Sequence, residues 1–212
     1  MSLLVKYNEN GDPIWTLRAG GDGYDSFKAV TVDSKGFIYV TGAVSQNSDI
    51  GSFTFTNPSD TDVVVAKISP TGTVIWAERF GGPGPDYGNS IALDANGAIY
   101  VTGAFSNTFD YQGQTFASNG GLDIFVIKYD PSGQLDWVKT YGGTFNDYGN
   151  GIATDNLNFS ITTGCFNTNT EFGDGNQNNQ GRPEASRAIA RDASNLGHAN
   201  YAPCRRPVYM KS

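Results

Sequence analysis

Residues 74–103 read VIWAERFGGPGPDYGNSIALDANGAIYVTG, and this stretch decides the fold because it repeats. The same pattern occurs one period of 61 residues earlier and, less completely, one period later. Similar segments at a fixed spacing are the signature of a repeat architecture, so the chain is an array of similar units. The positions that keep the phase most strictly are Trp15, Trp76 and Trp137, the glycine pairs 20–21, 81–82 and 142–143, and the aspartates Asp25, Asp86 and Asp147.

Apolar residues within one unit alternate with the two-residue period of β-strands. Turns such as Asp94-Ala95-Asn96-Gly97 separate these segments, with glycine at the position that needs a positive φ. Four short antiparallel strands per unit, without helices between them, favour the blade of a β-propeller, and a three-fold repeated β-sandwich is the alternative. The strands are expected at Val63–Ile68, Val74–Phe80, Ser90–Leu93 and Ala98–Thr102. The surplus length of the unit is expected in the Gly-Gly loop and at residues 106–122.

The repeats divide the chain into two parts. Residues 1–173 are expected to form three propeller repeats, an incomplete all-β array of about three four-stranded antiparallel blades. The third unit carries Thr154, Ser160 and Thr162 where the others have Val, Leu or Ile, which predicts a weaker blade. Residues 174–212 lose the phase and are expected to be a degraded fourth repeat or a disordered tail.

Composition excludes several classes of partner. A net charge of −7 and a pI of about 4.5 leave no broad basic surface for nucleic acid or anionic lipid. No stretch approaches the roughly 20 apolar residues of a membrane span, and the first residues resemble a strand rather than a signal peptide. The two cysteines, Cys165 and Cys204, cannot form a disulfide framework and leave the redox compartment open.

The segments 76–82, 86–94 and 97–103, with their Gly-Gly, Asp-x-x-Gly and Tyr-Val-Thr-Gly elements in that order, resemble the bacterial seven-bladed β-propeller (SBBP) repeats. The resemblance covers roughly residues 1–173. It implies a large bacterial protein that is secreted or attached to the cell surface, and it implies no particular activity.

The repeated residues have structural and functional interpretations. Asp25, Asp86 and Asp147 could form a repeated calcium or sugar site, but they lack the dense spacing of a calcium loop. We therefore favour side chains that close a loop on backbone amides. Asp33, Asp94 and Asp155 are interpreted as turn starters, and the three tryptophans as packing between blades rather than sugar platforms.

A catalytic group should instead break the repeat, and the candidates are few. The one histidine, His198, lies in the divergent tail, Cys165 takes the place of a small buried residue, and no carboxylate pair such as Glu78 and Asp110 stands out. The sequence therefore predicts no catalytic, cofactor or metal residues, and a non-enzymatic structural or binding module of an exported bacterial protein. A repeated carbohydrate- or calcium-binding propeller and a fragment of a propeller hydrolase are the alternatives.

Three blades cannot close a propeller ring, which usually needs four to eight. Both ends of such an array expose unpaired strand edges and apolar faces. The expected partners are therefore other blades or other copies of the same chain, with protein or carbohydrate as further candidates.

Overall fold

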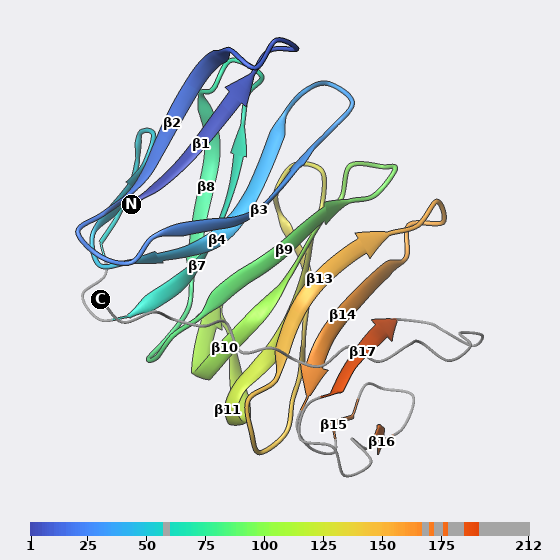
Figure 1. Cartoon of the computed structure of the whole chain (residues 1–212). Coiled ribbons are helices and arrows are strands. Elements are labelled where there is room, and N and C mark those ends of the chain that lie inside the picture. Colours follow the sequence, from blue (N-terminus) through green and yellow to red (C-terminus); the bar gives the residue numbers. More distant parts are fainter. Residues whose placement is uncertain (57–59, 167–169, 172–175, 178–184, 191–212) are drawn as a thin grey trace.

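The computed structural model describes residues 1–56 and 60–166, and three short strands at 170–171, 176–177 and 185–190. Every regular element in this part of the chain is a β-strand, which confirms the all-β expectation (Figure 1). The expectation for residues 174–212 falls outside the described residues except at two of these short strands. Several antiparallel sheets follow one another in a row, as in a propeller, so the alternative of one repeated sandwich is not what forms.

Two blades are complete within the described residues. The second blade contains, in spatial order, β3 (Ser26–Val32), β4 (Ile38–Ser45), β7 (Thr61–Ile68) and β8 (Val74–Phe80). The third blade repeats this order with β9 (Tyr87–Leu93), β10 (Ile99–Tyr111), β11 (Gln114–Tyr129) and β12 (Leu135–Tyr141). The expected strands are therefore present, and β10 and β11 are longer than the alternation of apolar residues suggested.

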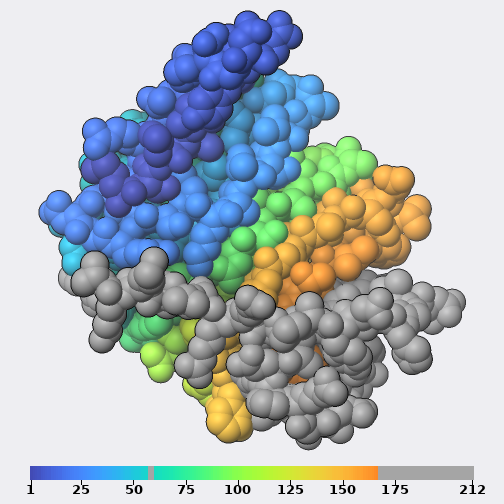
Figure 2. Space-filling view, viewed as in Figure 1, coloured from blue at the N-terminus to red at the C-terminus, as the bar shows by residue number. Residues whose placement is uncertain are grey.

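The two outer sheets differ from this pattern: among the described residues, the first has four strands, two of them only three residues long, and the fourth has three. The first blade has β1 (Ser2–Tyr7) and β2 (Pro13–Gly21), which correspond in phase to β7 and β8. The fourth has β13 (Tyr148–Thr154), β14 (Ser160–Phe166) and β17 (Ala185–Ala190), and β15 (Thr170–Glu171) pairs separately with β16 (Asn176–Gln177). Figure 2 shows β1 and β2, in dark blue, at one end of the described molecule.

The sequence unit and the blade are out of step. One period that begins at the strand Val63–Ile68 supplies the last two strands of the second blade and the first two strands of the third. The first strands of successive blades, β3, β9 and β13, lie side by side and contact one another (Figure 1). They therefore form the inner edge of the array, and β2, β8 and β12 lie toward its outer side.

The surplus length of the repeat forms a hairpin that reaches the preceding blade. β5 (Ser48–Ile50) and β6 (Phe53–Phe55) leave the second blade, and β5 pairs with the end of β2 in the register Ala19↔Ile50. In the third blade the corresponding segment is the extended tip of β10 and β11, as expected for residues 106–122. There Asp110 forms a bridge with Gly81, which follows β8. The hairpin thus ties each blade to the one before it.

The hydrophobic core lies between the blades. Along β7, Val64 and Ala66 pack toward the first blade, whereas Val63 and Val65 pack toward the third. Because β7 is buried on both faces, its sequence is a continuous apolar run rather than an alternating one. Full burial of each such side chain stabilises the fold by about 1.5–3 kcal/mol, so the blades stabilise one another through these two layers.

Candidate functional site

The repeated aspartates 25, 86 and 147 are buried in the loops that join one blade to the next. Asp86 Oδ2 accepts a hydrogen bond from Gly82 N at 2.9 Å, and Oδ1 accepts one from Ser106 N at 2.9 Å. Asp25 does the same with Gly21 N at 2.8 Å and Ser45 N at 3.2 Å. Asp147 Oδ2 accepts from Gly143 N at 2.7 Å. Each carboxylate therefore fastens a Gly-Gly loop.

A second buried aspartate, which the sequence analysis did not select, lies beside each of two of these carboxylates. Asp62 is 2% exposed, and its Oδ2 pairs with Arg79 Nε at 2.8 Å. A Cβ on Gly81 would lie 2.3 Å from Asp62 Oδ1 and 2.7 Å from Asp86 Oδ2, so glycine is needed where the two carboxylates converge. Burial raises the pKa of Asp86 to about 7, against the lowering effect of its two backbone hydrogen bonds.

The corresponding pair in the third blade has a different charge balance. Asp123 is 1% exposed, and Thr140 stands at the phase of Arg79. Asp123 Oδ2 accepts from Asn119 N at 2.7 Å, whereas its Oδ1 is buried without a hydrogen-bond partner. Burial, reinforced by the negative charge of Asp147, raises the pKa of Asp123 to about 6. The recurrence of Asp62 and Asp123 at one phase was the signal available in the sequence.

These carboxylates do not assemble a metal centre in the described part of the chain. No group of three or more His, Cys, Asp or Glu side chains lies close enough to hold a metal ion there. Both oxygens of Asp25 and of Asp86 accept backbone N–H groups. The calcium or sugar alternative at the repeated aspartates stays a prediction from the sequence.

The other phase-locked residues have the structural roles expected of them. Asp94 Oδ1 accepts from Asn96 N and Ala98 N, both at 2.9 Å, which closes the turn, and Asp33 and Asp155 repeat this geometry. Trp15 Nε1 donates to Pro70 O at 3.0 Å across the joint between the first two blades. The Trp76 ring lies against Gly133 of the third blade, where a Cβ would come within 3.0 Å. Interblade packing is thereby confirmed for Trp15 and Trp76.

Each of the inner strands β3, β9 and β13 contains a β-bulge that sequence reasoning missed. The register skips Lys28, Asn89 and Asn150, which occupy one repeat phase. A bulge re-aims the extra side chain away from its own ladder. Lys28 Nζ donates to Asn89 Oδ1 at 3.0 Å, and Asn89 Nδ2 donates to Gly149 O at 2.9 Å. The bulges therefore link the inner edges of three blades through polar side chains.

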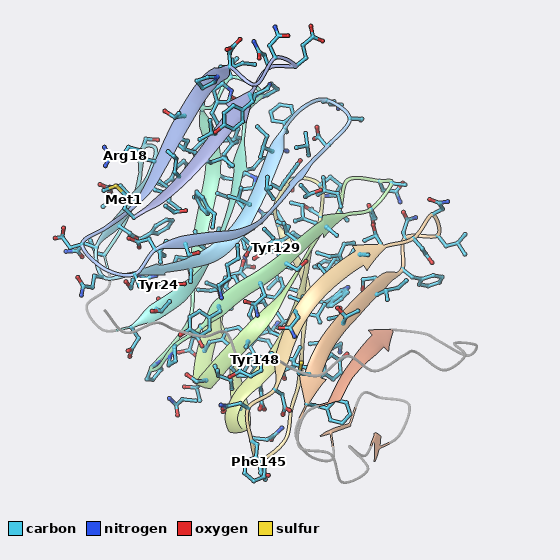
Figure 3. All side chains as sticks on the ribbon, viewed as in Figure 1. Met1, Arg18, Tyr24, Tyr129, Phe145 and Tyr148 are labelled. Carbon is cyan, nitrogen blue, oxygen red and sulfur yellow. The ribbon has the colours of Figure 1, made fainter. Side chains whose placement is uncertain are left out.

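One polar cluster breaks the repeat. Glu78 does not pair with Asp110; its Oε2 instead accepts a hydrogen bond from the Tyr111 hydroxyl. Tyr111 also lies 3.2 Å from the hydroxyl of Tyr129, a fully buried residue inside the array (Figure 3). Burial raises the pKa of Tyr111, so this phenol keeps its proton and acts as a hydrogen-bond donor. The cluster fastens the tip of the third blade to the second.

The remaining catalytic candidates offer no triad in the described residues. Cys165 is 5% exposed and disulfide-bonded. His198 and Cys204 lie outside the described residues. Among the residues that the structure describes, no helix is long and apolar enough to cross a membrane.

The first blade presents an open edge, and this is the most distinctive surface of the described molecule. β1 is the terminal strand of its sheet, so one of its edges has no strand partner among the described residues. Leu3 of β1 is 59% exposed, whereas Val64 at the same phase of β7 is fully buried. Val30 of β3 is 56% exposed, against 6% for Ile91 of β9. The apolar positions of the repeat are thus uncovered at this end.

Comparisons with known proteins agree with this architecture. A β-propeller repeat family, SBBP, matches residues 14–43 and 75–104. An uncharacterized WD repeat-containing protein of Acanthamoeba polyphaga mimivirus is 30% identical over an alignment of 198 residues, with 78% of this chain and 14% of the relative covered. The chain therefore spans about one seventh of the length of that relative, which is viral rather than bacterial. Each matched segment runs from a Trp strand through a glycine loop to the second strand of the next blade, and the chain is accordingly a β-propeller repeat module that carries SBBP repeats.

Proposed function

We propose that this chain is a non-enzymatic module that joins further blades, or further copies of itself, through its open blade edge, as a structural or binding part of an exported protein. The observation that carries the proposal is the uncovered end of the first two blades. Leu3, Val30 and Val32 are each more than half exposed there, next to the free edge of β1. Open strand edges with apolar neighbours are surfaces that proteins normally pair or cover.

The use of the polar groups supports a non-enzymatic role. Asp25 and Asp86 are occupied with backbone amides, and Glu78 accepts a hydrogen bond from the Tyr111 hydroxyl. A catalytic group needs a side chain that is free to exchange protons or to attack a substrate. Export is supported by the resemblance to SBBP repeats alone, and finding the parent protein in the envelope or medium fraction of its source would test it.

Self-association is tested by size-exclusion chromatography with light scattering over a wide range of protein concentrations. We expect the chain to form oligomers and Val30→Asp to shift them toward monomer, because a charge then occupies the uncovered apolar face. Ile14→Asp is the matched control: Ile14 is 57% exposed on β2, and Asp136 occupies its phase in the third blade. A monomer with a cooperative melt at every concentration would contradict the proposal, as would equal behaviour of the two variants.

A further inference from the structure

We infer that Asn119-Gly120 is a site of spontaneous covalent modification, at which hydrolysis converts Asn119 to aspartate or isoaspartate and loosens the joint between the third blade and the fourth sheet. The inference does not depend on self-association, because every contact that it uses lies within one chain. The chain holds four Asn-Gly pairs, at residues 10–11, 96–97, 119–120 and 150–151. One of them differs from the other three in how its backbone is held.

The reaction needs only an asparagine side chain, the backbone nitrogen of the next residue and water. The nitrogen of Gly120 loses its proton and bonds to the Cγ atom of Asn119. The amide nitrogen of Asn119 leaves as ammonia, which takes up the proton, and a succinimide ring remains. Water then opens the ring at either carbonyl group and gives aspartate or isoaspartate. Glycine favours the attack because it has no Cβ and its backbone adopts many conformations.

The backbone around Asn119 lies outside the β-ladder. Ser106 pairs with Leu122 and Thr108 pairs with Ala117, so the register of β10 and β11 skips residues 118–121. Both residues of the Asn-Gly pair are exposed to solvent. A bulge leaves its extra residues without ladder partners. Strand pairing therefore does not keep the glycine nitrogen away from the Cγ atom that it attacks.

Two of the other pairs lie in tight turns that hold the glycine nitrogen. Gly11 N donates a hydrogen bond to Asn8 O at 3.1 Å. Gly97 N donates to Asp94 O at 3.0 Å. The φ angles of the two glycines, 84° and 85°, lie in the left-handed region that these turns require. The hydrogen bonds must open before the nitrogen can attack, so both turns protect the asparagine that precedes the glycine.

The remaining pair, Asn150-Gly151, lies at the bulge of β13. This bulge contains one residue, and the register of β13 and β14 resumes at once with Gly151 opposite Thr163. Strand pairing therefore fixes the backbone of Gly151. Around Asn119, in contrast, the ladder is interrupted over residues 118–121.

Close packing requires glycine after the reactive asparagine. A Cβ on Gly120 would lie 2.4 Å from Thr144 O, in the loop 142–147 that leads to β13. A Cβ on Gly121 would lie 2.0 Å from Asn146 Oδ1 in the same loop. The fold thus excludes the larger residues that would slow the reaction at this position.

Asn119 fastens the joint through its backbone and its side chain. Its N–H donates to Asp123 Oδ2 at 2.7 Å, and its Nδ2 donates to Gly142 O at 3.3 Å. The modification replaces the Nδ2 donor with a carboxylate oxygen, which repels the carbonyl oxygen of Gly142. It also adds a negative charge beside Asp123, which is buried near the charge of Asp147. Isoaspartate further lengthens the backbone by one methylene group, so the loop 142–147 loses its attachment to β11.

The test incubates the folded full chain at mildly alkaline pH over several days and maps its peptides by mass spectrometry. We expect aspartate and isoaspartate to accumulate at position 119 at least about tenfold faster than at the other three Asn-Gly pairs, where local structure must open first. The same chain in concentrated urea is the reference, and there the rates should converge. Equal rates in the folded chain, or an unchanged order of rates in urea, would overturn the inference.

Two matched variants test the effect on the joint. Asn119→Gln and Asn96→Gln each keep an amide but form the larger ring far more slowly. The amides of Leu122 and Asp147 report the joint, because Leu122 N donates to Asn146 Oδ1 and Asp147 N donates to Leu122 O. After incubation, their hydrogen exchange should be several-fold faster in the parent and in Asn96→Gln, but not in Asn119→Gln. Unchanged exchange in a parent chain that is modified at position 119 would show that the joint is not loosened.

Discussion

Thr154 Oγ1 donates a hydrogen bond of 2.6 Å to the carbonyl oxygen of Leu93, and the two residues occupy the same phase of neighbouring blades. The bond joins the inner strands β13 and β9. Close to it, Ile152 N donates to Ser90 Oγ at 3.1 Å. The threonine that interrupts the apolar pattern of the third unit therefore makes an interblade contact that a valine or leucine could not make.

Thr154→Val should lower the free energy of unfolding by roughly 1 kcal/mol, because it removes this hydrogen bond while it keeps the shape of the side chain. The change is measured as a shift of the urea midpoint, with an unchanged slope of the free energy of unfolding against urea concentration. Thr16→Val on the exposed face of β2 is the control and should change stability by less than about 0.5 kcal/mol. An unchanged midpoint for Thr154→Val would show that the hydrogen bond makes no net contribution to the free energy of unfolding.

Stability should fall as the pH rises from 5 to 8. The folded pKa values of Asp123, about 6, and Asp86, about 7, exceed the ordinary value of 3.8, so the folded chain holds protons that the unfolded chain releases. This contribution is complete below about pH 4 and is lost as the pH rises through 6 and 7. Urea midpoints at pH 5 and 8 should differ by on the order of 2 kcal/mol.

Asp123→Asn should raise the urea midpoint at pH 8 and flatten the pH dependence, since it removes a buried charge beside Asp147 and keeps an acceptor for Asn119 N. Asp130→Asn provides a contrast, because the hydroxyl of Ser132, with backbone N–H groups, lowers the pKa of Asp130. That variant should lose stability at pH 8. If both variants shift the urea midpoint in the same direction, the charged form of Asp123 does not destabilise the fold.

Trp15→Phe should destabilise the chain more than Trp76→Phe, by roughly 1 kcal/mol. The Trp15 indole N–H donates to Pro70 O, whereas Trp76 Nε1 is buried without a hydrogen-bond partner. Both indoles lie against a turn glycine of the next blade, so the lost packing is similar. Thermal and urea unfolding of the two variants provide the comparison, and a larger loss for Trp76→Phe would contradict it.

The strands and turns were readable from the sequence because local chemistry determines them. Val74–Phe80 forms a strand with the expected bounds, and the Asp94 carboxylate closes the expected turn. Asn158 stands at the phase of the turn glycines Gly36 and Gly97, and its φ of 67° is the left-handed conformation that asparagine tolerates. Each of these features depends on residues within a few positions of one another.

The features that escaped sequence analysis depend on contacts between blades. The pairing of β5 with β2 has no local signal, because it joins two different blades. The bulge at Asn89 has none either, because its side chain bonds Lys28 and Gly149 in neighbouring blades. The role of Asp123 arises from its burial beside Asp147, although both residues repeat visibly in the sequence. Periodicity shows that the same residue type recurs in every unit. Only the packing of neighbouring blades shows which interaction that residue makes.

The offset between the 61-residue unit and the blade has a consequence for how such arrays can evolve. Tandem duplication of one whole unit adds two outer strands to one sheet and two inner strands to the next. The number of complete sheets therefore increases by one wherever the recombination point falls. An array with a whole number of units also has complementary half-sheets at its two ends. Genes can thus gain or lose any number of units while the two ends of the array keep complementary half-sheets. The duplicated segment therefore does not have to encode one complete blade.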